Sequence, residues 1–140
     1  MTKHEIRETA FILLFEASFR DETPEELYVL ADEVGELEVN DEVKSLVEGV
    51  MREAEHLDGI IASYSKKRAL SRIARVNLIV LRLAIYEIGN RPEVPVNVAV
   101  SEAVALSGTY AGAEDISFIN GVLGAYTRSL PPRESAPQEA

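Results

Sequence analysis

Side chains that could perform catalysis are few in this sequence. Its 140 residues include no cysteine and only two histidines, His4 and His56, which fall on different predicted helices. His56 and Asp58 could supply two metal ligands, but a histidine interacting with a helix dipole is the simpler interpretation. The chain has no GxxxxGKS/T, GxGxxG, GxSxG or HExxH motif. We therefore expect neither enzymatic activity nor a bound cofactor or metal ion.

Acidic pairs are abundant, but they occur where carboxylates stabilise helices. They stand at predicted helix starts or on solvated faces, where they complement the helix dipole. Nothing near them predicts the apolar pocket that would raise the pKa of an acid for catalysis. The pairs are Glu25-Glu26, Asp32-Glu33 and Asp41-Glu42.

A short cationic segment is better suited to binding an anion. The chain has 14 Lys+Arg and 24 Asp+Glu, yet residues 61–91 carry seven basic side chains and one acidic side chain. On one helix, Arg68, Arg72, Arg75 and Arg82 would span about 80° of the circumference. Such a row could follow a phosphate backbone or bind an acidic partner, or it could lie against acidic helices of its own chain. The spacing leaves these alternatives open.

Arg82 differs from the other arginines because it lies in an apolar stretch. From Val76 to Ile88 only Asn77, Arg82 and Glu87 are polar, so this helix must be enclosed by other helices. An enclosed guanidinium needs an internal acid or backbone carbonyls. Glu87 and Glu102 are the candidate partners.

Helical periodicity predicts that the elements positioning these side chains form an all-α fold. The first helix carries an apolar stripe from Ile6 to Ala17, and the last contains Gly121, which we expect to allow close packing. Further helices are expected over about 24–34, 41–54, 58–64, 76–88, 98–106 and 115–129. Residues 131–140 have no periodicity and are expected to be disordered.

Composition excludes several classes of protein. No apolar run approaches the roughly 20 residues of a membrane span, and the N-terminus lacks the layout of a signal peptide. The absence of cysteine excludes a disulfide scaffold and a thiolate metal site. A cytoplasmic protein with a single domain is expected.

Several segments match a known family in content, order and spacing, and the match covers nearly the whole chain except the tail. The matching segments are Arg7–Ala10, Leu57–Ile61, Leu81–Ile88, Val94–Leu106 and Phe118–Leu123. In these segments the chain resembles the NusB family of bacterial transcription antitermination factors.

The resemblance implies one helical RNA-binding domain over residues 1–130, with bundles over about 1–65 and 66–130, and no enzymatic activity. NusB proteins bind boxA RNA together with NusE, a small-subunit ribosomal protein. The pair joins NusA, NusG and RNA polymerase in an elongation complex on ribosomal RNA operons. The alternative is a helical protein-interaction scaffold, or a homodimer, with little RNA affinity of its own.

The resemblance also implies RNA contacts at Lys3, His4 and Arg7, where the family often carries an arginine-rich stretch. Glu5 departs from that pattern and opposes the remaining cations, so we expect weak RNA binding without NusE.

A second RNA-facing patch of the family corresponds to Glu114, Asp115 and Phe118. Phe118 is interpreted either as a stacking platform for a base or as a core residue.

Two further positions, Phe15 and Asn77, match the family's face toward NusE, although Phe15 could equally be a core residue. Arg68, Arg72 and Arg75 match no family motif, so a basic face formed by them is predicted from spacing alone.

Overall fold

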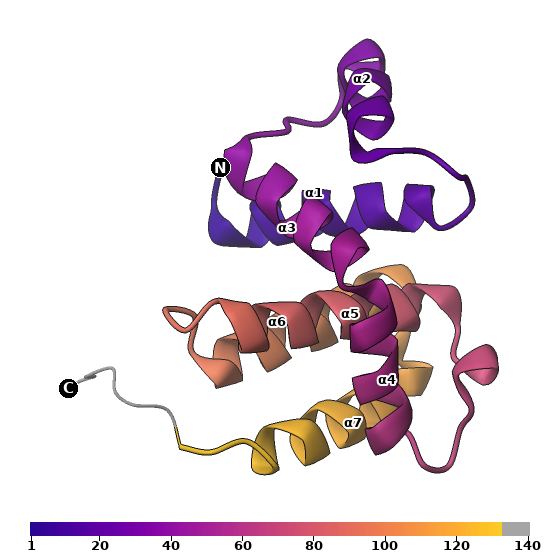
Figure 1. Cartoon of the computed structure of the whole chain (residues 1–140), viewed down its shortest axis with the longest axis vertical. Coiled ribbons are helices and arrows are strands. Elements are labelled where there is room, and N and C mark those ends of the chain that lie inside the picture. The colour runs from indigo at the N-terminus through magenta and orange to yellow at the C-terminus, as the bar shows by residue number, and fades with distance from the viewer. Residues whose placement is uncertain (133–140) are drawn as a thin grey trace. The chain divides into compact units, whose positions relative to one another are not determined.

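The computed structural model describes residues 1–132, and every regular element in this range is helical, which confirms the predicted all-α fold (Figure 1). The elements are α1 (Lys3–Ala17), α2 (Pro24–Val34), α3 (Asp41–Arg52), α4 (Ala54–Tyr64), η1 (Leu70–Arg72), α5 (Arg75–Asn90), α6 (Val96–Tyr110), η2 (Ala113–Asp115) and α7 (Ile116–Arg128), with η denoting a 3-10 helix. None of these helices is long and apolar enough to cross a membrane. Most of the tail predicted to be disordered, residues 133–140, lies outside the described range.

The chain divides into two compact units, Met1–Ala54 and Glu55–Ala140. The division predicted from the sequence lies about ten residues later, near residue 65. The structure assigns α4 to the second unit because its side chains contact the C-terminal helices. Tyr64 on α4 donates a hydrogen bond to Ser129 at 2.8 Å, and its ring packs edge-on against Tyr126 of α7.

Side-chain caps begin the three helices of the first unit. Thr2 and Thr23 each form a capping box, in which the hydroxyl accepts from a backbone N–H three residues on and a glutamate accepts the threonine N–H. Asn40 caps α3 by accepting from the N–H of Val43. Gly35 ends α2 in the left-handed conformation, with φ of 76°. The predicted bounds of α2 are therefore confirmed.

The core of the first unit lies between α1 and α3, which pack against each other. Its fully buried side chains include Ala10, Phe11, Val43 and Val47. The helix α2 contributes Leu27 and Ala31 to the buried set.

Tyr28 links α2 to α3, because its hydroxyl donates to Glu48 at 2.8 Å. Burial, together with the Glu48 carboxylate, raises the pKa of Tyr28 above its ordinary value. The phenol therefore remains a hydrogen-bond donor across the neutral range.

At the centre of the second unit is α5, against which α6 and α7 pack. Ten of its sixteen residues are buried, which confirms that this apolar helix is enclosed. Its start has no side-chain cap, and the same holds for α6 and α7. Packing fixes these helices more than local capping does.

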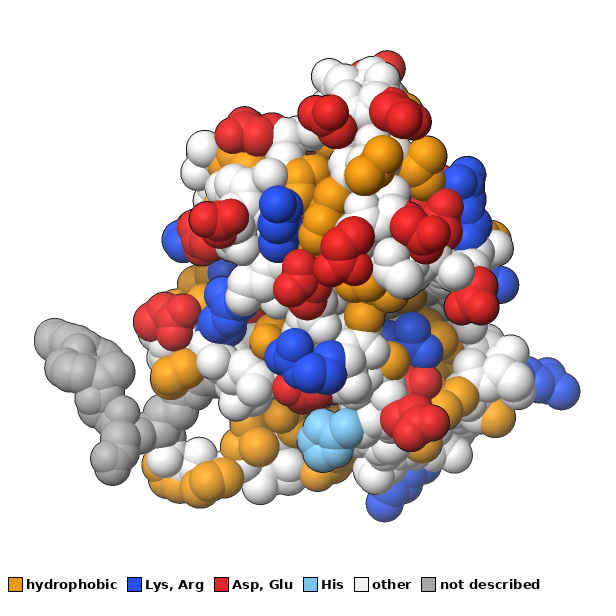
Figure 2. All heavy atoms as spheres, turned by 45° about the horizontal axis from the view of Figure 1, so that its top comes forward, with side chains coloured by type: hydrophobic (Ala, Val, Ile, Leu, Met, Phe, Trp, Pro, Cys, Tyr) orange, Lys and Arg blue, Asp and Glu red, His pale blue; other side chains and the backbone are white. Residues whose placement is uncertain are grey.

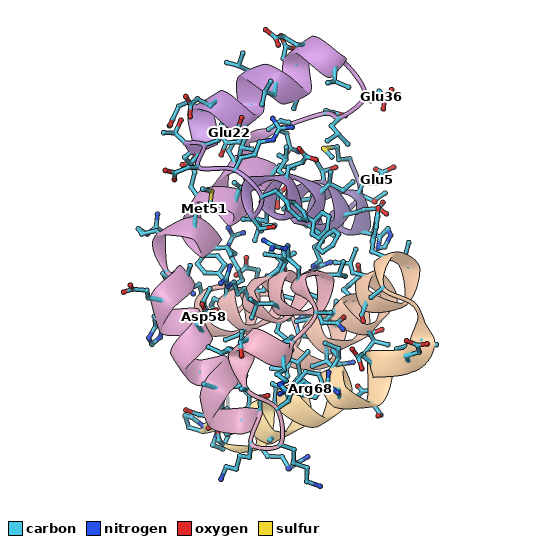
Figure 3. The ribbon with its side chains drawn as sticks, turned by 90° about the vertical axis from the view of Figure 1, so that its right-hand side faces the viewer. Glu5, Glu22, Glu36, Met51, Asp58 and Arg68 are labelled. Atoms are coloured by element: carbon cyan, nitrogen blue, oxygen red, sulfur yellow. The ribbon has the colours of Figure 1, made fainter. Side chains whose placement is uncertain are left out.

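The partner of Arg82 is Asp58, so the prediction of Glu87 or Glu102 is wrong. Arg82 donates from Nε and Nη2 to the two carboxylate oxygens of Asp58, at 2.7 and 2.8 Å. The predicted start of this helix near residue 58 is also wrong, since α4 begins at Ala54 and Asp58 lies in its middle (Figure 3). This two-bond pairing links α4 to α5.

Three smaller expectations also need correction. His56 lies in the first turn of α4, where the helix dipole does not favour a cation. The helix α6 begins at Val96, directly after Pro95, so Asn97 is inside it. Gly121 is exposed, and a Cβ atom there would meet nothing within 4 Å, so it does not serve close packing.

Candidate nucleic-acid interface

Phe118, in the first turn of α7, lies beneath an arginine. The Arg68 guanidinium carbon lies 4.0 Å from the centroid of the Phe118 ring. Arg68 Nη1 is also 3.4 Å from Asp115 Oδ2, and both side chains are about one-third exposed. This cation–π contact and ion pair bring together two predicted site residues and one arginine from the predicted basic face. We call Arg68, Asp115 and Phe118 the Arg68 cluster; Figure 3 labels Arg68.

Asp115 is held from inside the unit by a chain of hydrogen bonds. Asn77 Nδ2 donates to Asp115 Oδ2 at 2.9 Å, and Ser107 Oγ donates to Asn77 Oδ1 at 2.7 Å. Asn77 and Ser107 are both fully buried. These two hydrogen bonds therefore connect α6 through α5 to the carboxylate that Arg68 contacts. They fix the position of that carboxylate.

Burial of Asn77 conflicts with its interpretation as a direct partner contact. Its amide is used on both sides within the second unit, and the residue exposes 0% of its surface. Asn77 instead positions Asp115. The sequence signal was an isolated polar residue in an apolar helix, which indicates an internal hydrogen bond as readily as a surface role.

Phe118 is half-buried, so it is neither a fully buried core residue nor a fully exposed stacking platform. Arg68 covers one part of the ring, and the following residue, Ile119, is fully buried. Glu114 is exposed in η2, next to Asp115. The Arg68 cluster and the neighbouring Glu114 therefore combine an aromatic ring, one cation and two acids.

The predicted row of arginines does not lie on one helix. Arg68 is in a bend, Arg72 ends η1 and Arg75 begins α5. The helical geometry from which a common face was predicted is therefore wrong. Arg72 and Arg75 are exposed, whereas Arg68 is half-buried in its cluster.

The N-terminal residues Lys3 and His4 are exposed on the first turn of α1. Lys3 Nζ lies 2.6 Å from Glu42 on α3. Glu5 completes the Thr2 capping box, and the backbone hydrogen bond from Thr2 lowers the pKa of its carboxyl. Arg7, by contrast, exposes only 6% of its surface. Lys3 and His4 are therefore the accessible members of the predicted N-terminal set.

Three aromatic rings extend from the core to the surface along α1 and the turn that follows it. Phe11 is buried and stacks on half-buried Phe15, with centroids 5.9 Å apart. Phe15 makes an edge-to-face contact with Phe19 at 4.9 Å, and Phe19 is 59% exposed. We call these residues the α1 aromatic row. Phe19 is not among the contact residues predicted from the sequence, although its four-residue spacing from Phe15 indicates that the two rings lie side by side.

Among residues 1–132 there is no group of three or more side chains arranged to hold a metal ion.

Comparison with known proteins gives consistent results. A sequence model described as the NusB family matches residues 4–128. The transcription antitermination protein NusB of Acetivibrio thermocellus is 40% identical over 126 residues, which cover 89% of this chain and 87% of that protein. Its counterpart in Desulforudis audaxviator is 34% identical over 140 residues, covering 99% of this chain and 100% of that protein.

Solved structures show the same similarity. The structure of T. maritima NusB has a TM-score of 0.81 and 28% identity, covering 94% of each chain. A chain in the crystal structure of antitermination factors NusB and NusE in complex with dsRNA has a TM-score of 0.79 and 27% identity, covering 91% of this chain and 97% of that chain.

Proposed function

Since this chain belongs to the NusB family, we propose that it is a cytoplasmic transcription antitermination factor that binds boxA-type RNA together with NusE. In this proposal the pair acts in an elongation complex with NusA, NusG and RNA polymerase on ribosomal RNA operons. The observation that supports the proposal is the Arg68 cluster, in which a cation lies over Phe118, a half-buried ring that the family resemblance assigns to an RNA-facing patch.

The Arg68 cluster has the chemistry for binding an unpaired base. Bases stack on aromatic rings and on arginine planes, and a guanidinium can also contact phosphate. Because Arg68 already covers the Phe118 ring, we propose that a base stacks on the outer face of the guanidinium or takes its place on the ring. Glu114 and Asp115 oppose phosphate, so Asp115 acts by positioning Arg68 rather than by touching RNA.

Lys3 and His4 provide the second proposed RNA contact, whereas Arg7, the third residue of that set, is buried. Lys3 must exchange its ion pair with Glu42 for a phosphate, which is feasible because both side chains remain largely solvated. Few cations are thus available for RNA in a chain of net charge −10. NusE is expected to supply the rest of the attraction.

We propose Phe15 and Phe19 as the contact with NusE. An aromatic row that begins in the core and ends exposed gives a rigid apolar anchor, the kind of side chain that dominates protein interfaces.

The test is fluorescence anisotropy of a labelled boxA RNA with this protein, with NusE, and with both. The pair should bind far more tightly than either protein alone. This chain's own phosphate contacts should add about −2 to −3 to the log–log salt slope that NusE gives alone, because each single-strand phosphate contact contributes roughly −0.7. Equal binding by NusE alone and by the pair would refute the proposal.

A helical scaffold with little RNA affinity is the second candidate, favoured by the exposed end of the α1 aromatic row and the scarcity of free cations. Lys3→Glu separates the two candidates. It should weaken RNA binding by the pair if the antitermination proposal holds, and leave it unchanged in a scaffold or homodimer. Lys44→Glu, a charge reversal on α3, is the control.

A further inference from the structure

An apolar groove of about 390 Å³ lies between α1 and α2 within the first unit. Its floor contains three buried side chains, Leu13, Leu27 and Ala31. At its rim are Val34, which is 65% exposed at the end of α2, and the exposed acids Glu16 and Glu36. We call this feature the α1/α2 groove.

Acidic side chains dominate the surroundings of the groove. A neighbouring hollow on α2 is lined by Glu22, Glu25, Glu26 and Glu33 together with Val29. Glu22 and Glu36 lie at opposite ends of α2 (Figure 3). In the space-filling view, apolar side chains of this region are exposed between acidic ones (Figure 2).

Few cations compensate these acids. Residues 1–54 contain fifteen acidic and five basic side chains. Arg20 is the cation that meets this surface, at 3.5 Å from Glu16 and 3.4 Å from Glu22. Glu36 forms no ion pair with any residue of the described chain. The groove therefore combines an apolar floor with a strongly negative rim.

We propose that the α1/α2 groove docks a cationic amphipathic helix of another protein. Helices bind in grooves through apolar anchors at i, i+3, i+4 and i+7, which the floor around Leu13, Leu27 and Ala31 accommodates. Lysines and arginines flanking such anchors would meet the rim, giving electrostatic complementarity.

Other occupants fit this rim poorly. A second copy that used the same surface would bring the same acidic side chains against it, and a nucleic acid would be repelled. Neither the Arg68 cluster nor the α1 aromatic row lines the groove, so the inference goes beyond the proposed function.

The probe for this inference is a labelled peptide of about 15 residues, long enough for helix formation on binding. It carries leucines at the anchor positions and lysines elsewhere, and its matched partner carries glutamates in place of the lysines. In an anisotropy titration, the full-length protein should bind the lysine peptide, more weakly as salt is raised, and should not bind the glutamate peptide.

Two exposed valines of α2 provide matched variants. Val34→Lys places a cation at the groove and should weaken peptide binding by about tenfold or more. Val29→Lys adds the same charge on the same helix, but Val29 is 57% exposed and lines the neighbouring hollow, so it should bind almost as the unchanged protein does. Both positions are solvated, so both variants should fold, which circular dichroism checks.

Equal peptide affinity for Val34→Lys and Val29→Lys would overturn the inference, because it would indicate general adsorption to an acidic surface. Val34→Lys should also retain RNA binding together with NusE. If Val34→Lys lost RNA binding together with NusE, the groove would be part of the proposed RNA–NusE complex. That result would overturn the claim that the groove is a separate docking surface. Failure of RNA binding in the unchanged protein would refute the proposed function alone.

Discussion

In the Met1–Ala54 unit each helix begins with a side chain that caps its own backbone, whereas in the Glu55–Ala140 unit α5, α6 and α7 begin without one. Both units contain polar contacts between residues far apart in sequence, but in the second unit these contacts include those of α5, which has no side-chain cap. Arg82 binds Asp58, and Asn77 joins Ser107 to Asp115. Helix boundaries are thus determined locally in the first unit and by packing in the second.

The two units also differ in charge. The first has five basic and fifteen acidic side chains, while the second has nine of each. Most of the cations suited to RNA are therefore in the second unit, and the first unit is better suited to a basic protein partner. One small chain can in this way present two surfaces with different binding chemistry.

The largest effect should come from replacing a core aromatic residue of the first unit, and the matching replacement in the second unit should cost less. Phe11→Ala should lower the free energy of unfolding by about 3–5 kcal/mol, the usual cost of removing a fully buried phenylalanine. Phe118→Ala should cost only about 1–2 kcal/mol, because the ring is half-buried and loses mainly its contact with Arg68. Urea unfolding measures both. Equal costs would show that Phe118 is a core residue and remove it from the proposed interface.

The pair between Asp58 and Arg82 gives the next largest effect. Removing one partner of a buried pair costs roughly 3–5 kcal/mol. The side chains here keep 21% and 26% exposure, so solvent screening reduces the expected cost of Asp58→Ala to about 2 kcal/mol. Asp32→Ala removes an exposed acid of α2 and should change the free energy of unfolding by less than about 0.5 kcal/mol. Similar results for both variants would contradict the long-range stabilisation of the second unit.

The sequence predicts local features of the first unit better than the long-range contacts of the second unit. The bounds of α2 were predicted because threonine, proline and glycine at its ends act on their own backbone. The partner of Arg82 was predicted wrongly because Asp58 is 24 residues away, and nothing local indicates that α4 packs beside α5. A salt bridge between helices depends on their packing, which single-sequence periodicity does not contain.

The candidate site shows the same limit. Asp115 and Phe118 were predicted as site residues from a family resemblance. Arg68 was predicted only as part of a basic face on one helix, and the structure contradicts that helix. The bend that contains Arg68 brings it over Phe118, which is 50 residues away in the sequence. Burial of Asn77 likewise depends on α6 supplying Ser107. The sequence shows which residue types are present. Which of them contact one another depends on how the helices pack.

Local capping in the first unit predicts a moderate effect at Thr23. Thr23→Ala removes the hydroxyl that accepts from the Glu26 N–H but keeps the backbone N–H that donates to the Glu26 carboxylate, and it should lower the free energy of unfolding by about 1 kcal/mol. Thr23→Ser keeps the hydroxyl and should be nearly neutral. Urea unfolding of the two variants tests this difference, and equal values would show that Pro24 and packing alone determine the start of α2.

The smallest effect should be a pH dependence from Glu5. The backbone hydrogen bond from Thr2 lowers the pKa of Glu5 below 4.5 in the folded chain, so its capping contribution is complete above that pH. The contribution is lost as the pH falls through the lowered folded pKa, because protonation then removes the charge that both the cap and the helix dipole favour. Glu5→Gln keeps a capping oxygen without the charge. The unchanged protein should therefore be more stable than Glu5→Gln at pH 6, with the difference shrinking toward pH 3 in parallel urea titrations. A difference that stays constant with pH would mean that the Glu5 charge contributes nothing to the start of α1.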